Sequence, residues 1–151
     1  KIYEEIKSIN FKQKKLLGIC LGMQLLLDYS NEFEKCDGLG LINGENIRLC
    51  DRSATNNKLN IPHINWRPIE THSNEAKNDQ IMKKIAENDE FYFIHSFMAQ
   101  PSNKNHLFAS YDYEGNKIPA VIKKDLIYGF QFHPEKSGKP GLKLLNEFLK
   151  L

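Results

Sequence analysis

The chain has 151 residues, of which 40% are hydrophobic and 26% charged, with a formal net charge of +2. This composition is typical of a globular domain that is long enough to bury a core of its own. The small net charge argues against a nucleic-acid-binding face, and no apolar run reaches the roughly 18 residues of a membrane span. We therefore expect one soluble domain that contacts neither nucleic acid nor membrane.

Three cysteines, Cys20, Cys36 and Cys50, lie far apart in the sequence. An odd number at wide spacing fits neither a disulfide framework nor a CxxC zinc site, and the five histidines add no ligand spacing. We expect a reducing, cytoplasmic environment, no metal ion and no organic cofactor. Cys36 and Cys50 are interpreted as inert thiols.

The first 30 residues predict a helix, a strand and a second helix. Ile2, Ile6 and Ile9 recur at helical spacing within residues 1–10. The short apolar run 16–19 is typical of a buried strand in a parallel sheet, and residues 21–29 turn helical.

The rest of the chain alternates glycine-rich turns with apolar stretches. A polar loop is expected over 51–60, a compact proline-bracketed stretch over 61–69 and a helix around 80–87. The remaining strands are expected as short pieces in 36–49, then 91–94, 107–113, 118–123 and 127–132, before a final helix that opens at Pro140. We predict an α/β fold with a mostly parallel, mixed sheet flanked by helices.

Cys20 stands in Gly18-Ile19-Cys20-Leu21-Gly22, between the predicted strand and helix. This is the cysteine form of the nucleophile elbow, a sharp turn that presents a reactive side chain. Small residues at 18 and 22 let backbone segments approach closely. We expect the start of the following helix to favour the thiolate and the Leu21 N–H to serve as an oxyanion donor.

His133-Pro134-Glu135 follows the predicted strand 127–132. A nucleophilic thiol needs a proton acceptor, usually a histidine oriented by a carboxylate. Because ligands bind at the carboxyl ends of strands in open α/β sheets, we expect His133 at the same edge as Cys20.

Three ordered motifs resemble the class I (triad) glutamine amidotransferases: residues 18–24 (GICLGMQ), 93–96 (FIHS) and 129–138 (GFQFHPEKSG). More narrowly, the chain is similar to the glutaminase subunits of imidazole glycerol phosphate synthases. Residues 38–42, Ile61-Pro62-His63 with Trp66, and 141–145 add to this likeness, which covers most of residues 16–150.

The resemblance implies Cys20 as nucleophile, His133 as base and then acid, and Glu135 as the residue that orients His133. It implies hydrolysis of L-glutamine to glutamate and ammonia through a thioester. Gln24 matches a glutamine-contacting position, and the backbone at Ser96 and Phe97 matches the segment that holds the substrate's α-carboxylate.

The resemblance also implies a heterodimer with a cyclase-type (β/α)8 barrel synthase, through which ammonia travels for histidine biosynthesis. His63, Trp66 and Lys136 match positions at that interface. From the residues alone, Trp66 also fits a core aromatic, Lys136 a solvated lysine, and His95 a hydrogen-bonded residue at a strand end.

Two features depart from the family. Its usual Pro-His-Met-Gly-Trp is Pro62-His63-Ile64-Asn65-Trp66 here, with a bulkier Asn in place of Gly. Family members also carry, before the first helix, a strand and a glycine-rich loop that supplies the other oxyanion contact. Because the sequence begins inside a helix and without Met, we expect residues 1–151 to form a single, N-terminally truncated domain with half an oxyanion hole.

Three alternatives stay open. The same chemistry serves amidination of surface sugars in some relatives of these subunits. Another cysteine hydrolase of this fold would share the motifs, for example a γ-glutamyl hydrolase or an amidotransferase of purine, pyrimidine or folate metabolism. The last alternative is a catalytically silent subunit that only organises a synthase.

Overall fold

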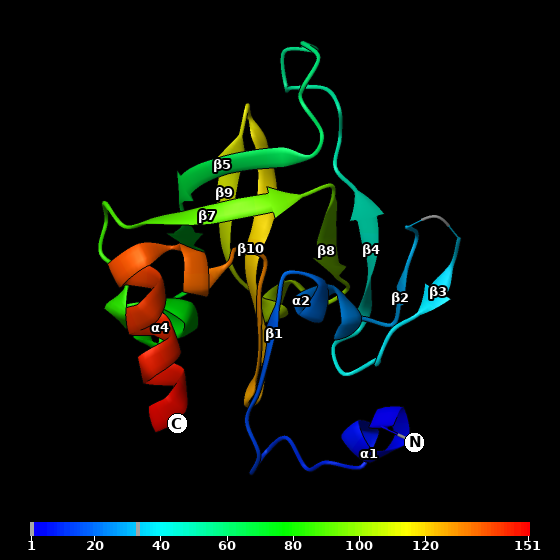
Figure 1. The fold of residues 1–151 in the computed structure, drawn as a ribbon, viewed down its shortest axis with the longest axis vertical. Helices are drawn as coiled ribbons and strands as arrows, with labels where there is room; N and C mark the ends of the chain where they lie inside the picture. The colour runs from blue at the N-terminus through cyan, green and yellow to red at the C-terminus, as the bar shows by residue number, and fades with distance from the viewer. Residues whose placement is uncertain (1, 33) are drawn as a thin grey trace.

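The computed structural model describes residues 2–32 and 34–151, whose strands form three sheets accompanied by short helices (Figure 1). No helix of the described residues is long and apolar enough to cross a membrane. The elements in chain order are α1 (Ile2–Lys7), β1 (Leu16–Ile19), α2 (Leu21–Leu25), β2 (Tyr29–Ser30), β3 (Cys36–Asp37), β4 (Gly44–Arg48), β5 (His63–Pro68), β6 (Glu70–Thr71), α3 (Asn74–Asn78), the 3-10 turn η1 (Met82–Lys84), β7 (Glu90–His95), β8 (Phe97–Pro101), η2 (Lys104–His106), β9 (Leu107–Tyr113), β10 (Asn116–Lys124), β11 (Ile127–Phe130), η3 (Pro134–Lys136) and α4 (Gly138–Lys150).

The largest sheet has the strand order β1-β11-β10-β9-β6. A second sheet has the order β3-β2-β4-β8, and β5 pairs with β7 across the front of Figure 1. The mixed α/β architecture is the expected one, but the expectation of mostly parallel pairing is corrected. Within the described ranges only β1–β11 and β2–β4 are parallel. The connections between β9, β10 and β11 are tight turns, which are too short for the crossover that parallel neighbours require.

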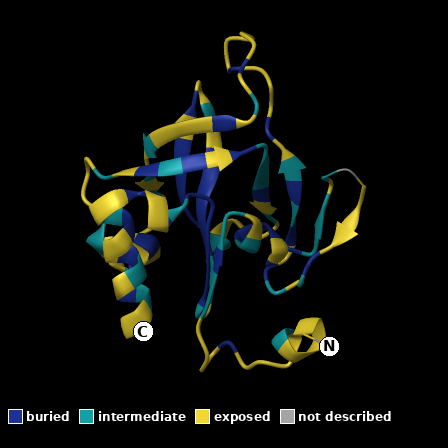
Figure 2. Ribbon diagram, in the orientation of Figure 1, coloured by how far each residue is buried: buried dark blue, intermediate teal, exposed yellow. Residues whose placement is uncertain are grey.

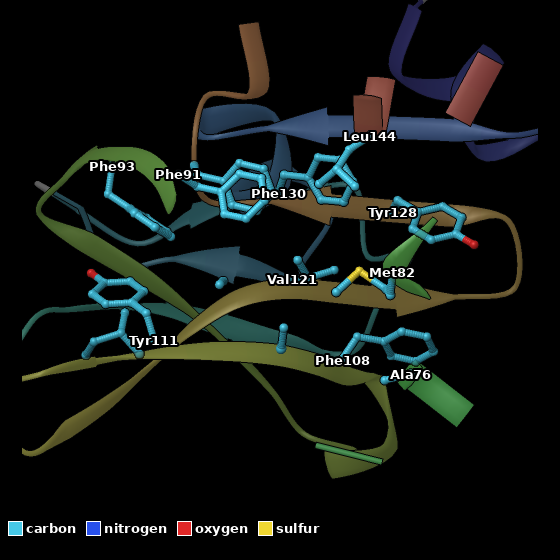
Figure 3. Packing of buried hydrophobic residues seen from close by; sticks show 14 of the residues in the cluster. Ala76, Met82, Phe91, Phe93, Phe108, Tyr111, Val121, Tyr128, Phe130 and Leu144 are labelled. Carbon is cyan, nitrogen blue, oxygen red and sulfur yellow. The ribbon is translucent and has the colours of Figure 1, made fainter. Parts of the chain in front are cut away.

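The main hydrophobic core lies between β7 and the large sheet, where aromatic rings pack against one another (Figure 3). Along β7, Phe91, Phe93 and His95 are buried, while Tyr92 is half-buried and Ile94 is exposed. The ribbon of β7 in Figure 2 changes colour along its length accordingly. Each fully buried Phe contributes roughly 1.5–3 kcal/mol. The alternation that builds this core therefore also carries His95 into the interior.

Several elements differ from their expected bounds. α2 ends at Leu25, because the Asp28 carboxylate accepts a hydrogen bond from the Gly44 N–H and the following residues join β4 as β2. The helix expected over 80–87 is replaced by α3, whose first turn is capped by the Ser73 hydroxyl, and by the single turn η1. Strand β8 had no sequence prediction, since it follows β7 after one residue, Ser96.

Candidate active site

Cys20 is the turn between β1 and α2, as the elbow motif predicts. Its backbone has φ 50° and ψ −107°, a conformation that residues other than glycine rarely adopt and that is common at functional turns. The Cys20 N–H donates a 2.7 Å hydrogen bond to the Phe130 carbonyl of β11. The strained turn is thus tied to the adjacent strand.

The two glycines of the motif have different roles. A methyl group on Gly18 would lie 2.5 Å from the Gly22 carbonyl oxygen, so no side chain fits there. A methyl group on Gly22 would meet nothing within 4 Å. The steric explanation expected for both positions therefore holds for Gly18 only.

The Cys20 sulfur lies among backbone and amide groups. Its thiol donates toward the Ile94 carbonyl at 3.8 Å, and the Gln131 side-chain amide lies 3.7 Å from the sulfur. Burial raises the pKa of Cys20 above its ordinary value; the Leu21 N–H opposes this rise, and the negative charge of Glu135 adds to it. Burial is the largest influence on this thiol, and it opposes the thiolate that the sequence analysis expects.

His133 and Glu135 form a hydrogen-bonded pair. The His133 Nδ1 lies 2.7 Å from the Glu135 Oε1, and a carboxylate only accepts, so Nδ1 carries the proton. The other ring nitrogen, Nε2, is left as the free proton acceptor. The Ser137 hydroxyl donates to the His133 carbonyl at 2.6 Å, which holds the turn η3 in place.

Strands β1 and β11 bring the nucleophile and the histidine to one edge of the sheet. They pair in parallel, with Ile19 opposite Phe130. Cys20 and His133 thus follow neighbouring strands at the same end, which confirms the expected juxtaposition. Among the described residues no hydrogen bond joins the Cys20 sulfur to the His133 ring; Gln131 is the side chain on β11's continuation that reaches the sulfur.

Gln24 and the segment 96–97 lie directly beside this edge. The Gln24 side chain is buried, and its amide donates to the Phe97 carbonyl at 3.1 Å and to the Gln131 side-chain oxygen at 3.4 Å. The Ser96 carbonyl accepts from the Leu49 N–H at 2.9 Å, which fixes the segment against β4. The structure therefore gathers all the residues that the sequence assigned to glutamine, including the exposed Leu21 at the start of α2.

The three residues expected at a partner interface are placed differently. Trp66 is 44% exposed and packs its indole against the Tyr92 ring, at 5.7 Å between centroids. Lys136 is exposed on η3. His63 is buried, with 3% exposure, so its side chain points into the domain and not toward a partner.

Two acidic or amide side chains of the site had no sequence assignment. Gln131 is fully buried between Cys20 and Gln24, and its place between the strand 127–130 and His133 was the available signal. The negative charge of Glu32 is the smallest of the influences that raise the pKa of the Cys20 thiol. Within the described residues, no cluster of three or more His, Cys, Asp or Glu side chains is suited to a metal ion.

Two solved structures from Thermotoga maritima share this fold. PurLQS matches 99% of this chain and 68% of its own, with a TM-score of 0.69 and 18% identity. A glutamine amidotransferase matches with a TM-score of 0.59 and 17% identity, over 99% of this chain and 52% of its own. At these identities the likeness shows the fold alone, and the fold is that of a glutamine amidotransferase.

The family is shown by sequence. The family model for "Glutamine amidotransferase class-I" matches residues 2–151, and the chain belongs to this family. Imidazole glycerol phosphate synthase subunit HisH 1 of Legionella pneumophila (strain Lens) is 44% identical over 98% of this chain and 70% of its own length. Subunit HisH of Bacillus subtilis (strain 168) is 41% identical over 90% of this chain and 61% of its own length.

Proposed function

We propose that this chain is the glutaminase part of a cytoplasmic imidazole glycerol phosphate synthase, acting in histidine biosynthesis. The observation that carries the proposal is the 44% identity to the Legionella pneumophila subunit over nearly the whole chain. The site geometry fits the same activity, because a strained Cys20 stands at one sheet edge with the paired His133 and Glu135.

In the first half-reaction, the raised pKa of Cys20 keeps the sulfur protonated until a base takes the proton. Nε2 of His133 accepts it as the sulfur attacks the side-chain carbonyl carbon of glutamine. Glu135 holds the Nδ1 proton and stabilises the imidazolium that forms. His133 then protonates the leaving nitrogen, so ammonia departs and a thioester remains on Cys20.

In the second half-reaction, Nε2 of His133 takes a proton from water, which attacks the thioester carbonyl and breaks its C–S bond. Glutamate is released, and His133 returns the proton to the Cys20 sulfur. The Leu21 N–H, which already lies beside the sulfur, donates to the oxyanion in both halves.

The proposed partner is a (β/α)8 barrel synthase that receives the ammonia. Its docking surface is the outer face of β5 and β7, where Ile64, Trp66 and Ile94 are exposed. An apolar face that carries a Trp is a common centre of binding energy. The Ile94 carbonyl also accepts a hydrogen bond from the Cys20 thiol, so this face lies next to the centre that releases ammonia.

The test uses the complete polypeptide with its barrel partner. Glutamine-dependent release of glutamate is expected from the wild-type pair and absent in Cys20→Ala, because no other group can form the thioester. Cys36→Ala is the matched control, since this exposed free cysteine should leave the rate unchanged. Glutaminase activity that survives Cys20→Ala would remove the mechanism.

The ammonia acceptor is tested in cells. The complete polypeptide should restore growth without histidine to a strain that lacks its own glutaminase subunit. Failure of growth despite measured glutaminase activity would assign the chain to another acceptor, such as a surface sugar.

A further inference from the structure

A line of three buried side chains leads away from the site into the core. His95 on β7, Tyr111 on β9 and His63 on β5 are each at most 6% exposed. The Tyr111 hydroxyl lies 2.8 Å from the His95 Nε2 and 2.9 Å from the His63 Nδ1. His63 and His95 are directly opposite each other in the β5–β7 pair, so one hydroxyl can reach both rings.

The direction of each hydrogen bond follows from its first member. The His95 Nδ1 lies 2.8 Å from the Phe97 carbonyl oxygen, which can only accept, so Nδ1 donates. Burial lowers the pKa of His95 to about 4, so the ring holds a single proton at neutral pH and its Nε2 must accept. The hydroxyl of Tyr111, whose pKa burial raises, therefore donates to His95.

The direction of the hydrogen bond at the His63 end follows by the same reasoning. Because its own proton is committed to His95, the Tyr111 oxygen accepts from the His63 Nδ1. Burial lowers the pKa of His63 to about 4, so its Nε2 carries no proton. That nitrogen is buried and has no hydrogen-bond partner among the described residues. The line therefore has one polarity, from His63 through Tyr111 and His95 to the Phe97 carbonyl.

The His95 end of this line contacts residues of the candidate active site. The Phe97 carbonyl accepts from both His95 and Gln24, and Gln24 continues to Gln131 and the Cys20 sulfur. Two donors on one carbonyl fix the orientation of the peptide at 97, which belongs to the segment assigned to the substrate's α-carboxylate. None of the three relay residues reaches the reacting atoms itself.

We propose that His63, Tyr111 and His95 are positioning residues: they form a one-way hydrogen-bond relay that orients the Phe97 peptide, and with it the glutamine-binding backbone beside Cys20. The inference rests on the proposed function, since it assigns the relay to glutamine binding. Loss of a link should loosen the α-carboxylate site more than the chemistry at the sulfur. The expected signature is a raised KM for glutamine with a nearly unchanged kcat.

The kinetic test is Tyr111→Phe, which removes the hydroxyl and keeps the ring, in the complete polypeptide with its synthase partner. A lost neutral hydrogen bond predicts a roughly five- to tenfold higher KM, with kcat within about twofold of the wild type. Tyr113→Phe is the matched control on the same strand, because its hydroxyl bonds the Asn60 carbonyl and lies outside the relay. His63→Asn, which keeps a donor at the Nδ1 position, should preserve the wild-type KM, whereas His63→Leu should raise it.

Nitrogen NMR of the histidine rings tests the polarity without any activity. Both His63 and His95 should show a protonated Nδ1 and a bare Nε2 at neutral pH. A protonated Nε2 on either ring, or an unchanged KM in a folded Tyr111→Phe, would overturn the relay. If the wild-type pair has no glutaminase activity, the proposed function fails, while the NMR result still decides whether the relay exists.

Discussion

His133 and His95 both stand where a strand ends near Cys20, yet their surroundings differ. The His133 side chain is 21% exposed and is paired with the carboxylate of Glu135. His95 is buried between a carbonyl and a hydroxyl, and burial lowers its pKa to about 4. A carboxylate partner at an open edge stabilises an imidazolium, which suits a histidine that gains and loses a proton during the reaction. Neutral partners in the core suit a histidine that stays neutral and only orients its hydrogen-bond partners.

The largest expected effect separates the two histidines by activity. His133→Ala should lower kcat for glutamine by about 10⁴-fold or more, because the Cys20 thiol then has no base. The free energy of unfolding should change by less than about 1 kcal/mol, since the ring is partly exposed. Steady-state glutaminase assays and urea unfolding measure both quantities. A loss of activity matched by a comparable loss of stability would show that His133 is structural.

The second prediction concerns the buried histidines, His63 and His95, and the loss of folding stability at acid pH. His63 and His95 have folded pKa values of about 4 against an ordinary value of 6.5, so the unfolded chain binds protons first as the pH falls. Their stabilisation is complete above pH 6.5 and is lost toward pH 4, at roughly 2 kcal/mol for each ring by pH 5.

Urea unfolding between pH 7 and 5 measures this loss. His63→Asn removes one of the histidines with a lowered pKa and should make the decline with pH shallower. A decline of equal slope in the variant and the wild type would contradict the assignment of a depressed pKa to buried His63.

A smaller effect concerns the turn that places Cys20 beside both histidines. Gly18→Ala should destabilise the fold by about 1–3 kcal/mol, because the methyl group would overlap the Gly22 carbonyl. Gly22→Ala, where a methyl group meets nothing within 4 Å, should be tolerated or stabilise α2 by roughly 0.5–1 kcal/mol. Thermal unfolding of the two variants compares them, and equal melting temperatures would refute the different roles of the glycines.

The smallest effect compares buried and exposed residues on one strand, β5. Trp66→Ala should weaken binding of the synthase partner about tenfold, because Trp66 is exposed on the proposed docking face. His63→Asn should leave this affinity unchanged, since His63 is buried. Isothermal titration calorimetry measures both affinities. Equal weakening by the two substitutions would place His63 on the interface after all.

Local patterns were enough for the elements that carry the chemistry. The apolar run before Cys20 predicted β1 with its observed bounds, and the range 107–113 matches β9. Periodicity failed where contacts distant in sequence decide the structure. Residues 29–30 leave the helix to pair with β4. Within the range 80–87 only the turn η1 forms, directly after Asp79, whose carboxylate is bound by Tyr128 and Lys123.

The sequence by itself determined the nucleophile turn at Cys20 and the His133–Glu135 pair, because each depends on a few neighbouring residues. Only the tertiary structure decided the parallel pairing of β1 with β11 and the pKa shifts of Cys20, His63 and His95. Burial raises the pKa of Cys20 and lowers those of His63 and His95, and the packing of β5, β7 and β9 brings Tyr111 between the two rings. Desolvation depends on everything that surrounds a group in three dimensions, and no local motif encodes it.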